Sequence, residues 1–580
     1  MSVVHKKSFS DPKLAWFKKA RFGLFIHFGL YSRLGRGEWV QYKENIHPDD
    51  YAKLALAFNP HNFRAEDWVS LAEESGCRYI AFTAKHHDGF CLFDSDLTDY
   101  KITNTPFKRD LTAELVSACH KKNMPIILYY SQPDWHHPNF VHLPGLFKDI
   151  DVPPAGFRPD WNSYLSYYHG QVEELCTRYG RIDGIWFDGA QKGEKNWQGK
   201  KIYNLIKKHQ PHAAVNERAG YGDFFTPERF MPGDLPGYLF EACESISKIH
   251  WGYYRQSPQY SVQHLLSTFI RIMAKGGNFL LNTGPGPDGV IPQYQAERLR
   301  LIGKWMHENH EAVYASESIG NSGIQYPLMK KENSLFVFLP AWPDTDSITL
   351  ENIPAAEKAA LLPETPLVSA MSGKNLIISG LPPLAPSSFP QIIRIDFKKF
   401  PVIKAAGKKE KLPCITLENK CLLPAELGER HGLGFKGKKA DLFKSSRLDY
   451  KKEGEEFSCE FTDPEQKINW LLFVKKAGRY RVGVLLSSSG QTAGTTFLVK
   501  AGKKQLEFKS SETYSVKIPA GSRVIYNCGQ QIMADKNYRW QQAGLLELPQ
   551  GNVRLSFSVK EYVFGCQSGK IKAIMLSRKK

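Results

Sequence analysis

The sequence predicts an α/β fold, a (β/α)8-like barrel, followed by two all-β domains: a β-sandwich and a C-terminal β-jelly-roll module. Short apolar runs alternate with longer helical patterns up to about residue 290, a last long helical pattern ends at residue 314, and short strand patterns separated by turns follow it. With 580 residues the chain is too long for one hydrophobic core. We therefore expect three domains, residues 1–314, 315–398 and 399–580.

Seven short apolar runs bounded by turn residues predict the parallel strands of the barrel. They are "RFGLFIHFG" (21–29), "YIAFTAKHHDGF" (79–90), "PIILYYSQ" (125–132), "GIWFDG" (184–189), "HAAVNER" (212–218), "YLFEACES" (238–245) and "NFLLNTGP" (278–285). Helical patterns such as "RAEDWVSLAEESG" (64–76) separate them, and several end in glycine, as helix C-termini often do. Seven or eight such units in about 250 residues favour a closed barrel. A doubly wound sheet is the alternative, but no glycine-rich phosphate-binding loop follows the first strand.

The pattern changes after the last long helix, "YQAERLRLIGKWMHENHEAVY" (294–314). The strand patterns of the predicted β-sandwich are "SLFVFLPAWPD" (334–344), "SITLENI" (347–353), "NLIISGL" (375–381) and "QIIRIDF" (391–397). A linker rich in lysine precedes the predicted jelly-roll, which includes "INWLLFVKKAGRYRVGVLLSS" (468–488) and "NVRLSFSVK" (552–560). In this last module Trp470, Tyr538 and Trp540 are candidates for stacking on sugars, although aromatic residues in strands more often belong to a core.

Composition excludes several classes of function. The formal charge is +18, but the lysines gather in pieces such as "AAGKKEKLP" and "SRKK" without interleaved aromatic residues, so we expect no nucleic-acid partner. The ten cysteines form no C-x-x-C pair, and no metal site is expected. No segment holds 18 uninterrupted apolar residues, so no membrane span is expected. The N-terminal segment lacks the apolar core of a signal peptide, which predicts a cytoplasmic protein or an exported one whose signal has been removed.

Polar residues follow every predicted barrel strand, at the end where such barrels carry their active sites. They are His27, His86 and His87, Tyr129 and Tyr130, Asp188, Asn216 with Glu217 and Arg218, Glu241 with Glu244, and Asn282. Two carboxylates from separate strands among histidines are typical of glycoside cleavage, in which one carboxylate attacks or activates water and the other protonates the leaving oxygen. Trp39, Trp251 and Phe224 are candidates to cover the apolar face of a sugar ring. His86 and His87 are a poor metal pair, because neighbouring residues of a strand point to opposite faces.

The motifs at these positions resemble those of a known family. In order, "WFKKARFGLFIHFGLYS", "GEWVQY", "YIAFTAKHHDGFCLFDS", "RDLTAELVSAC", "GIWFDG", "VNER", "FEACESI" followed by "HWGY", and "GGNFLLNTGPGPDGVI" are similar to those of the family 29 glycoside hydrolases, the α-L-fucosidases. The resemblance covers residues 10 to 320, and that family also carries a β-sandwich after its barrel. The last module resembles carbohydrate-binding jelly-rolls, by a much weaker match.

The resemblance implies a role for each matching residue. Asp188 stands where the family has its catalytic nucleophile and Glu241 where many members have the acid/base. Glu217, Glu244 and Glu38 are competitors for the acid/base role. The residues expected to hold the fucose ring are His27, Glu38, Trp39, His86, His87, Tyr130 and Arg218, with Trp251 at the border of the pocket. Tyr129 is the alternative to Tyr130, because adjacent strand residues cannot both point inward. The chain departs from the family pattern at Phe240 and Val40.

These observations predict a retaining exo-α-L-fucosidase that removes terminal fucose from fucosylated oligosaccharides or glycoconjugates. The expected route is a double displacement through a covalent glycosyl-enzyme, and it needs no cofactor. The alternatives are a related retaining glycosidase that accepts an α-L-galactoside, since an apolar pocket rejects one added hydroxyl only weakly, and a degenerate barrel that only binds carbohydrate. The sequence leaves the linkage, the aglycone and the oligomeric state open.

Overall fold

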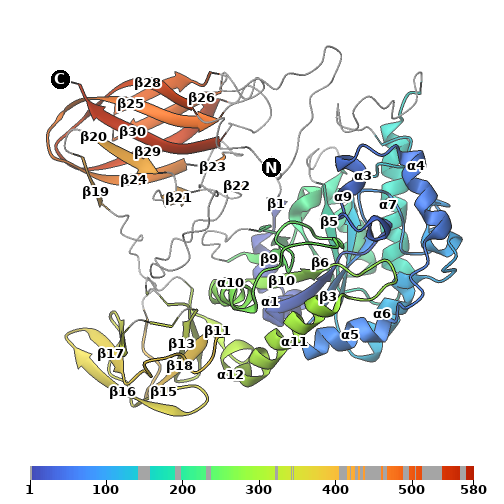
Figure 1. Ribbon diagram of the computed structural model, residues 1–580, viewed down its shortest axis with the longest axis horizontal. Coiled ribbons are helices and arrows are strands. Elements are labelled where there is room, and N and C mark those ends of the chain that lie inside the picture. Colours follow the sequence, from blue (N-terminus) through green and yellow to red (C-terminus); the bar gives the residue numbers. More distant parts are fainter. Residues whose placement is uncertain are drawn as a thin grey trace. The chain divides into compact units, whose positions relative to one another are not determined.

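The computed structural model describes residues 3–140, 157–189, 197–229, 237–320, 324–403 with gaps at 325, 341 and 344, and parts of 414–579 (Figure 1). Residues 1–229 and 235–405 form one compact unit, and residues 406–580 with 230–234 form a second. The first unit contains a parallel barrel sheet and an antiparallel sheet, and the second contains two further sheets. The predicted combination of a (β/α)8-like barrel with all-β regions is confirmed.

Eight strands form the barrel sheet, and all of their pairings are parallel. They are β2 (Phe22–Ile26), β3 (Ile80–Lys85), β4 (Ile126–Ser131), β5 (Gly184–Asp188), β6 (Ala214–Val215), β8 (Phe224–Phe225), β9 (Leu239–Ser245) and β10 (Asn278–Thr283). Their order is β6-β5-β4-β3-β2-β10-β9-β8, and a parallel bridge between Asn216 and Phe224 joins the two ends. This bridge brings the first and last strands together, so the sheet is a nearly closed barrel.

Burial on both faces explains why the strand sequences are apolar runs rather than alternating patterns. All residues of β2, β3, β4, β9 and β10 are buried, and in β5 only the last residue, Asp188, is partly accessible. Inside the barrel, aromatic and aliphatic side chains such as Phe25, Tyr79 and Trp186 pack into one cluster. The barrel is therefore a filled core, and its polar residues are concentrated at the strand ends.

Among the described residues, six longer helices accompany the barrel strands (Figure 1). They are α5 (Ala65–Glu74), α6 (Leu111–Lys121), α7 (Trp161–Thr177), α9 (Gly199–His209), α10 (Val262–Ala274) and α11 (Gln293–Glu308). Three of them begin at a side-chain cap: Asp110, Asp160 and Ser261 each accept a hydrogen bond from a backbone N–H of the first turn. The buried faces of these helices hold apolar residues at the spacing of an amphipathic helix.

An antiparallel eight-stranded sheet follows the barrel in the same unit. Its strands are β11 (Glu317–Ser318), β12 (Leu328–Lys331), β13 (Ser334–Leu339), β14 (Ser347–Leu350), β15 (Lys358–Leu361), β16 (Thr365–Ser372), β17 (Asn375–Ser379) and β18 (Gln391–Asp396). It has its own apolar core. Hydrogen bonds from Trp305 to the Pro390 carbonyl and from Gln263 to the Pro340 carbonyl attach it to α11 and α10.

The second unit contains two six-stranded sheets around a shared apolar core. Its longer strands are β24 (Lys467–Val474), β25 (Gly478–Ser487), β26 (Thr496–Ala501), β27 (Lys504–Lys509), β28 (Arg539–Leu548), β29 (Gly551–Glu561) and β30 (Lys570–Arg578). Trp540 on β28 is 43% exposed and does not belong to this core. Tyr538 and the side chain of Trp470 lie outside the described residues.

Candidate active site

Asp188 lies at the C-terminal end of β5, where its carboxylate has several donors. Oδ1 accepts hydrogen bonds from Arg218 Nη1 at 2.6 Å and from the backbone N–H of Gly189 at 2.8 Å. Oδ2 accepts from the Tyr129 hydroxyl at 2.9 Å and lies 3.6 Å from His87 Nε2. Burial raises the pKa of Asp188, but Arg218, by its charge and its hydrogen bond, together with His87 and the Tyr129 hydroxyl, lowers it by more, to about 2. Asp188 is therefore a stable carboxylate at neutral pH.

Three histidines from two neighbouring strands lie together beside this carboxylate. His27 follows β2, and His86 and His87 follow β3. His27 Nδ1 lies 2.6 Å from Asn282 Oδ1, and His87 Nδ1 lies 2.6 Å from the Ser131 hydroxyl. Burial lowers the pKa of all three, that of His27 to about 3, so the rings are neutral. His86 Nδ1 is buried and has no hydrogen-bond partner among the described residues. A neutral ring with an unused nitrogen is suited to a hydroxyl group.

Glu38, Trp39 and Trp251 lie around the same cluster. The indole of Trp39 is 5.0 Å from the His87 ring, and that of Trp251 is 5.4 Å from the His27 ring, between ring centroids. Glu38 is buried, and its Oε2 accepts hydrogen bonds from the backbone N–H groups of Trp251 and Gly252, each at 2.9 Å. Glu38 thus fixes the segment that carries Trp251.

Tyr129, and not Tyr130, faces the carboxylate, which corrects the expectation for this pair. The Tyr130 hydroxyl donates to Gln171 Oε1 at 2.7 Å, and its ring packs on Tyr168 of α7, outside the barrel. Tyr129 points inward, where its ring lies 5.6 Å from Trp186 and 5.6 Å from His27. Both tyrosines belong to β4 and both are buried, so burial alone did not distinguish them.

Glu241 lies inside the barrel rather than at its mouth, which corrects the expected acid/base position. Its side chain is fully buried, and its oxygens accept hydrogen bonds from the Tyr79 hydroxyl at 2.5 Å and from Trp186 Nε1 at 2.8 Å. It pairs in register with Asn278, the first residue of β10, whereas Asp188 ends its strand. Burial raises the pKa of Glu241 to about 7. A carboxyl group enclosed in this way is not accessible to a leaving group.

Glu228, which the sequence arguments missed, is the carboxylate that shares a partner with Asp188. Arg218 donates to Asp188 with Nη1 and to Glu228 Oε2 with Nη2, the latter at 2.9 Å. The Glu228 side chain is 41% exposed. It lies after the two-residue strand β8, which is too short to form an apolar run in the sequence. The sequence could therefore have indicated Glu228 only through its position between two barrel strands.

The other glutamates named as competitors are held by backbone groups. Glu217 accepts from the Thr226 backbone N–H and hydroxyl, and Glu244 accepts from the Ser245 backbone N–H. Glu38 is held as described above.

Phe224 does not face the site, which corrects its expected role as a sugar platform. It is fully buried in the barrel core, with its ring 4.4 Å from that of Phe17.

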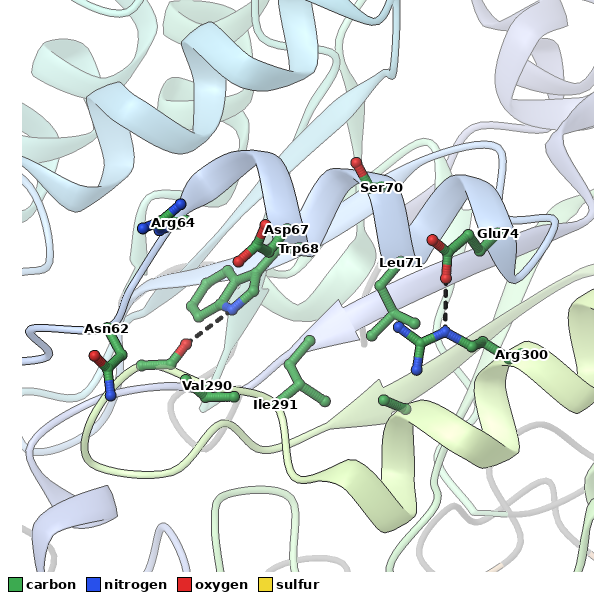
Figure 2. Close-up of a pocket in the computed structure, with 12 residues that line it drawn as sticks. Asn62, Arg64, Asp67, Trp68, Ser70, Leu71, Glu74, Val290, Ile291 and Arg300 are labelled. Carbon is green, nitrogen blue, oxygen red and sulfur yellow. Dashed lines mark hydrogen bonds and ion pairs between the residues drawn. The ribbon is translucent and has the colours of Figure 1, made fainter.

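A surface pocket of about 280 Å³ lies between α5 and α11 (Figure 2). Its lining includes Trp68, which donates to the Gly289 carbonyl, and the Glu74–Arg300 ion pair. It shares no residue with the cluster around Asp188, so we do not assign the chemistry to it.

Within the part of the chain that the structure describes, no group of three or more His, Cys, Asp and Glu residues is arranged to hold a metal ion. No helix there is long and apolar enough to cross a membrane.

An ionised carboxylate and a second, accessible carboxylate, both bound to one arginine at the strand ends of a barrel, are the arrangement that a glycoside hydrolase requires. The family model for alpha-L-fucosidase matches residues 4–311, more than half of the chain. The chain belongs to this family, the α-L-fucosidases of glycoside hydrolase family 29.

Individual relatives agree with this assignment. The tissue alpha-L-fucosidase of Rattus norvegicus is 29% identical over 420 residues, which cover 66% of this chain and 88% of that protein. The structure of alpha-L-fucosidase isoenzyme 1 from Paenibacillus thiaminolyticus shares 32% identity, covers 68% of this chain and 100% of its own, and has a TM-score of 0.62. A trapped covalent intermediate of the Bacteroides thetaiotaomicron enzyme with 2-fluoro-fucosyl fluoride shares 26% identity, with coverages of 67% and 96% and a TM-score of 0.59.

Proposed function

We propose that this protein is a retaining exo-α-L-fucosidase that releases terminal fucose from fucosylated oligosaccharides or glycoconjugates by double displacement. The observation that carries the proposal is the Asp188–Arg218–Glu228 arrangement. In retaining glycosidases the two carboxyl groups lie about 5 to 5.5 Å apart, and one guanidinium group between two carboxylates keeps them close. The covalent intermediate of the Bacteroides thetaiotaomicron relative supports the same route.

Asp188 is the proposed nucleophile. Attack on the anomeric carbon requires the ionised form, and Arg218 together with the Tyr129 hydroxyl stabilises that form. Its position at a strand end among buried histidines supports a site that encloses one terminal sugar. In this proposal the unused His86 Nδ1 accepts a hydrogen bond from a fucose hydroxyl, and the indoles of Trp39 and Trp251 cover apolar parts of the ring.

Glu228 is the proposed acid/base, in place of Glu241. The acid must reach the glycosidic oxygen of a leaving group that differs from substrate to substrate, so it must be accessible. Glu228 is exposed and bonded to the arginine that holds the nucleophile, whereas both Glu241 oxygens are engaged inside the barrel. In the first step Glu228 protonates the departing oxygen while Asp188 bonds to the anomeric carbon. In the second step Glu228 takes a proton from the water that releases fucose.

Replacement of the nucleophile tests the double displacement. We expect Asp188→Gly to lower kcat on an aryl α-L-fucoside by about 10⁴-fold or more, by analogy with the removal of other covalent nucleophiles. Azide should partly restore the reaction and give fucosyl azide, because the glycine leaves room for an external nucleophile. Full activity without azide would contradict the assignment of Asp188. An assay of the matched α-L-galactoside measures the selectivity against one added hydroxyl.

Replacement of the acid tests Glu228 separately. For Glu228→Gln we expect kcat/KM to fall strongly for fucosides with poor leaving groups and little for those with acidic phenols, which leave without protonation. Plotted against leaving-group pKa, log kcat/KM should become steeper than in the native protein. A slope equal to the native one would show that Glu228 is not the acid.

A further inference from the structure

Glu241 is a buried carboxyl group that the proposed reaction does not use. Its two oxygens accept one hydrogen bond each, from the Tyr79 hydroxyl and from the indole N–H of Trp186. The Tyr79 ring itself fits only because Gly23 has no side chain: a Cβ there would lie 2.3 Å from the ring. Since a buried polar group without a partner is costly, these two donors are specific partners of Glu241.

Trp186 contacts the two side chains, those of Arg218 and Tyr129, that donate hydrogen bonds to the Asp188 carboxylate. The guanidinium carbon of Arg218 lies 4.4 Å from the centre of the indole ring. The Tyr129 ring lies 5.6 Å from the indole at an interplanar angle of 19°, nearly parallel. Arg218 and Tyr129 then donate to the two oxygens of Asp188. The plane of one indole therefore sets the position of two donors at the reacting carboxylate.

We propose that Glu241 is a positioning residue, which fixes the indole plane of Trp186 and through it the alignment of Arg218 and Tyr129 on Asp188. An indole has a single N–H donor, so one acceptor decides how the ring is turned. Without that acceptor the buried N–H is unpaired, and the ring turns toward another acceptor or the cavity. Displacements of about 1 Å at a reacting group cost about 100-fold in rate, so the effect is measurable although Glu241 does not touch substrate.

The inference rests on the proposed function, because it needs Asp188 as the reacting carboxylate. The experiment compares Glu241→Leu, Glu241→Gln and Tyr79→Phe in the full chain, with a series of aryl α-L-fucosides of different leaving-group pKa. Glu241→Leu should lower kcat/KM by about 10- to 100-fold, by the same factor for every leaving group, so that its plot is parallel to the native one. Glu241→Gln keeps an oxygen for the Trp186 N–H and should stay within about 3-fold of the native protein.

Tyr79→Phe is the matched control, because it removes the other hydrogen bond of the same carboxyl group and leaves the indole bond in place. It should lower the melting temperature without lowering kcat/KM. A purely structural role would give Tyr79→Phe and Glu241→Leu the same losses, and this result would overturn the inference. If Glu241→Leu fails to fold, Trp186→Phe, which keeps an aromatic ring but lacks the N–H, takes its place. In that variant kcat/KM should fall by the same factor for every leaving group. Native activity in that variant, or in folded Glu241→Leu, would also overturn it.

The leaving-group series separates this inference from the proposed acid/base. A steeper slope in Glu241→Leu, with partial rescue by azide, would overturn the positioning role and return the acid/base role to Glu241. If the slope of log kcat/KM against leaving-group pKa is native in Glu228→Gln, while kcat/KM of Glu241→Leu falls by the same factor for every leaving group, the acid/base assignment of Glu228 is refuted. The positioning role of Glu241 then remains supported.

Discussion

Arg218 is the residue on which the candidate active site depends most directly. Its side chain is only 14% exposed, and its guanidinium group contacts Asp188, Glu228 and the face of Trp186. A planar, permanently charged guanidinium group can bond to two carboxylates and stack on a ring at once, which a lysine cannot do. It helps to keep the Asp188 carboxylate ionised while it holds the Glu228 carboxylate nearby.

The pH dependence of Arg218→Met tests the electrostatic part of this role. The proposed reaction needs Asp188 ionised, and the pKa of Asp188 is lowered because Arg218, together with His87 and Tyr129, outweighs burial. Without the guanidinium group, burial raises that pKa. The acidic limb of kcat/KM should therefore move to higher pH, with a larger loss of activity at acidic than at neutral pH. Arg178→Met, at an exposed ion pair with Asp96, is the control and should leave the profile unchanged. An unmoved acidic limb in Arg218→Met would contradict the prediction.

Single residues were predictable where one strand end carried one polar group. Asp188 is such a case, because a carboxylate that closes an apolar run needs a partner or a function. Tyr129 and Tyr130 were not separable, since both faces of β4 are buried and alternation carries no information there. The depth of Glu241 in the barrel was not predictable for the same reason, because the sequence of a fully buried strand does not indicate how deep each residue lies.

At the scale of elements, a buried ion pair connects two strand ends of the site. Lys85, the last residue of β3, lies 3.0 Å from Asp134 in the segment after β4, and both side chains are almost fully buried. The backbone N–H of Trp135, the residue after Asp134, donates to the His87 carbonyl at 2.8 Å. Burial raises the pKa of Asp134, but Lys85 together with His137 and His136 lowers it by more, so the pKa lies below its ordinary value. The pair thus holds the segment that carries His87 against β4.

Removal of one partner of this pair should be strongly destabilising. Lys85→Met leaves an unpaired buried carboxylate, and we expect the free energy of unfolding to fall by about 3 to 5 kcal/mol. The double variant Lys85→Met, Asp134→Asn should lose less than the sum of the single variants, because neither charge is then left alone. Lys53→Met, at the exposed pair with Asp50, is the control and should show no measurable change. Chemical denaturation measures all four, and additive losses would contradict the coupling.

Most barrel elements were predictable from apolar runs and their helices, but one strand was not. β8 consists of Phe224 and Phe225 alone, too short to form a run, and it completes the sheet by pairing with β9 and bridging to Asn216. Glu228 lies three residues after the end of this strand, so a carboxylate beside this strand was not predicted. Parallel pairing between distant segments determines such a strand, and local sequence carries little of that information.

At the scale of the whole molecule, the chain contains two compact units with separate apolar cores. All the residues assigned to the reaction belong to the first unit, residues 1–229 and 235–405. The sheet that follows the barrel is bonded to α10 and α11, whereas the second unit has its own sandwich core. Chemistry on a small substrate should therefore need only the first unit.

Truncation after residue 405 tests this division. Because the barrel and the following sheet keep their cores and mutual hydrogen bonds, the shortened protein should fold and keep kcat/KM on an aryl α-L-fucoside within about 3-fold. The exposed Trp540 indole of the removed unit is able to stack on sugars, so we expect a larger loss on an insoluble fucosylated polymer than on the aryl fucoside. Trp540→Ala in the full chain is the matched control and should reproduce the loss on the polymer only. A folded truncated protein without activity on the aryl fucoside would show that residues beyond 405 contribute to the site itself.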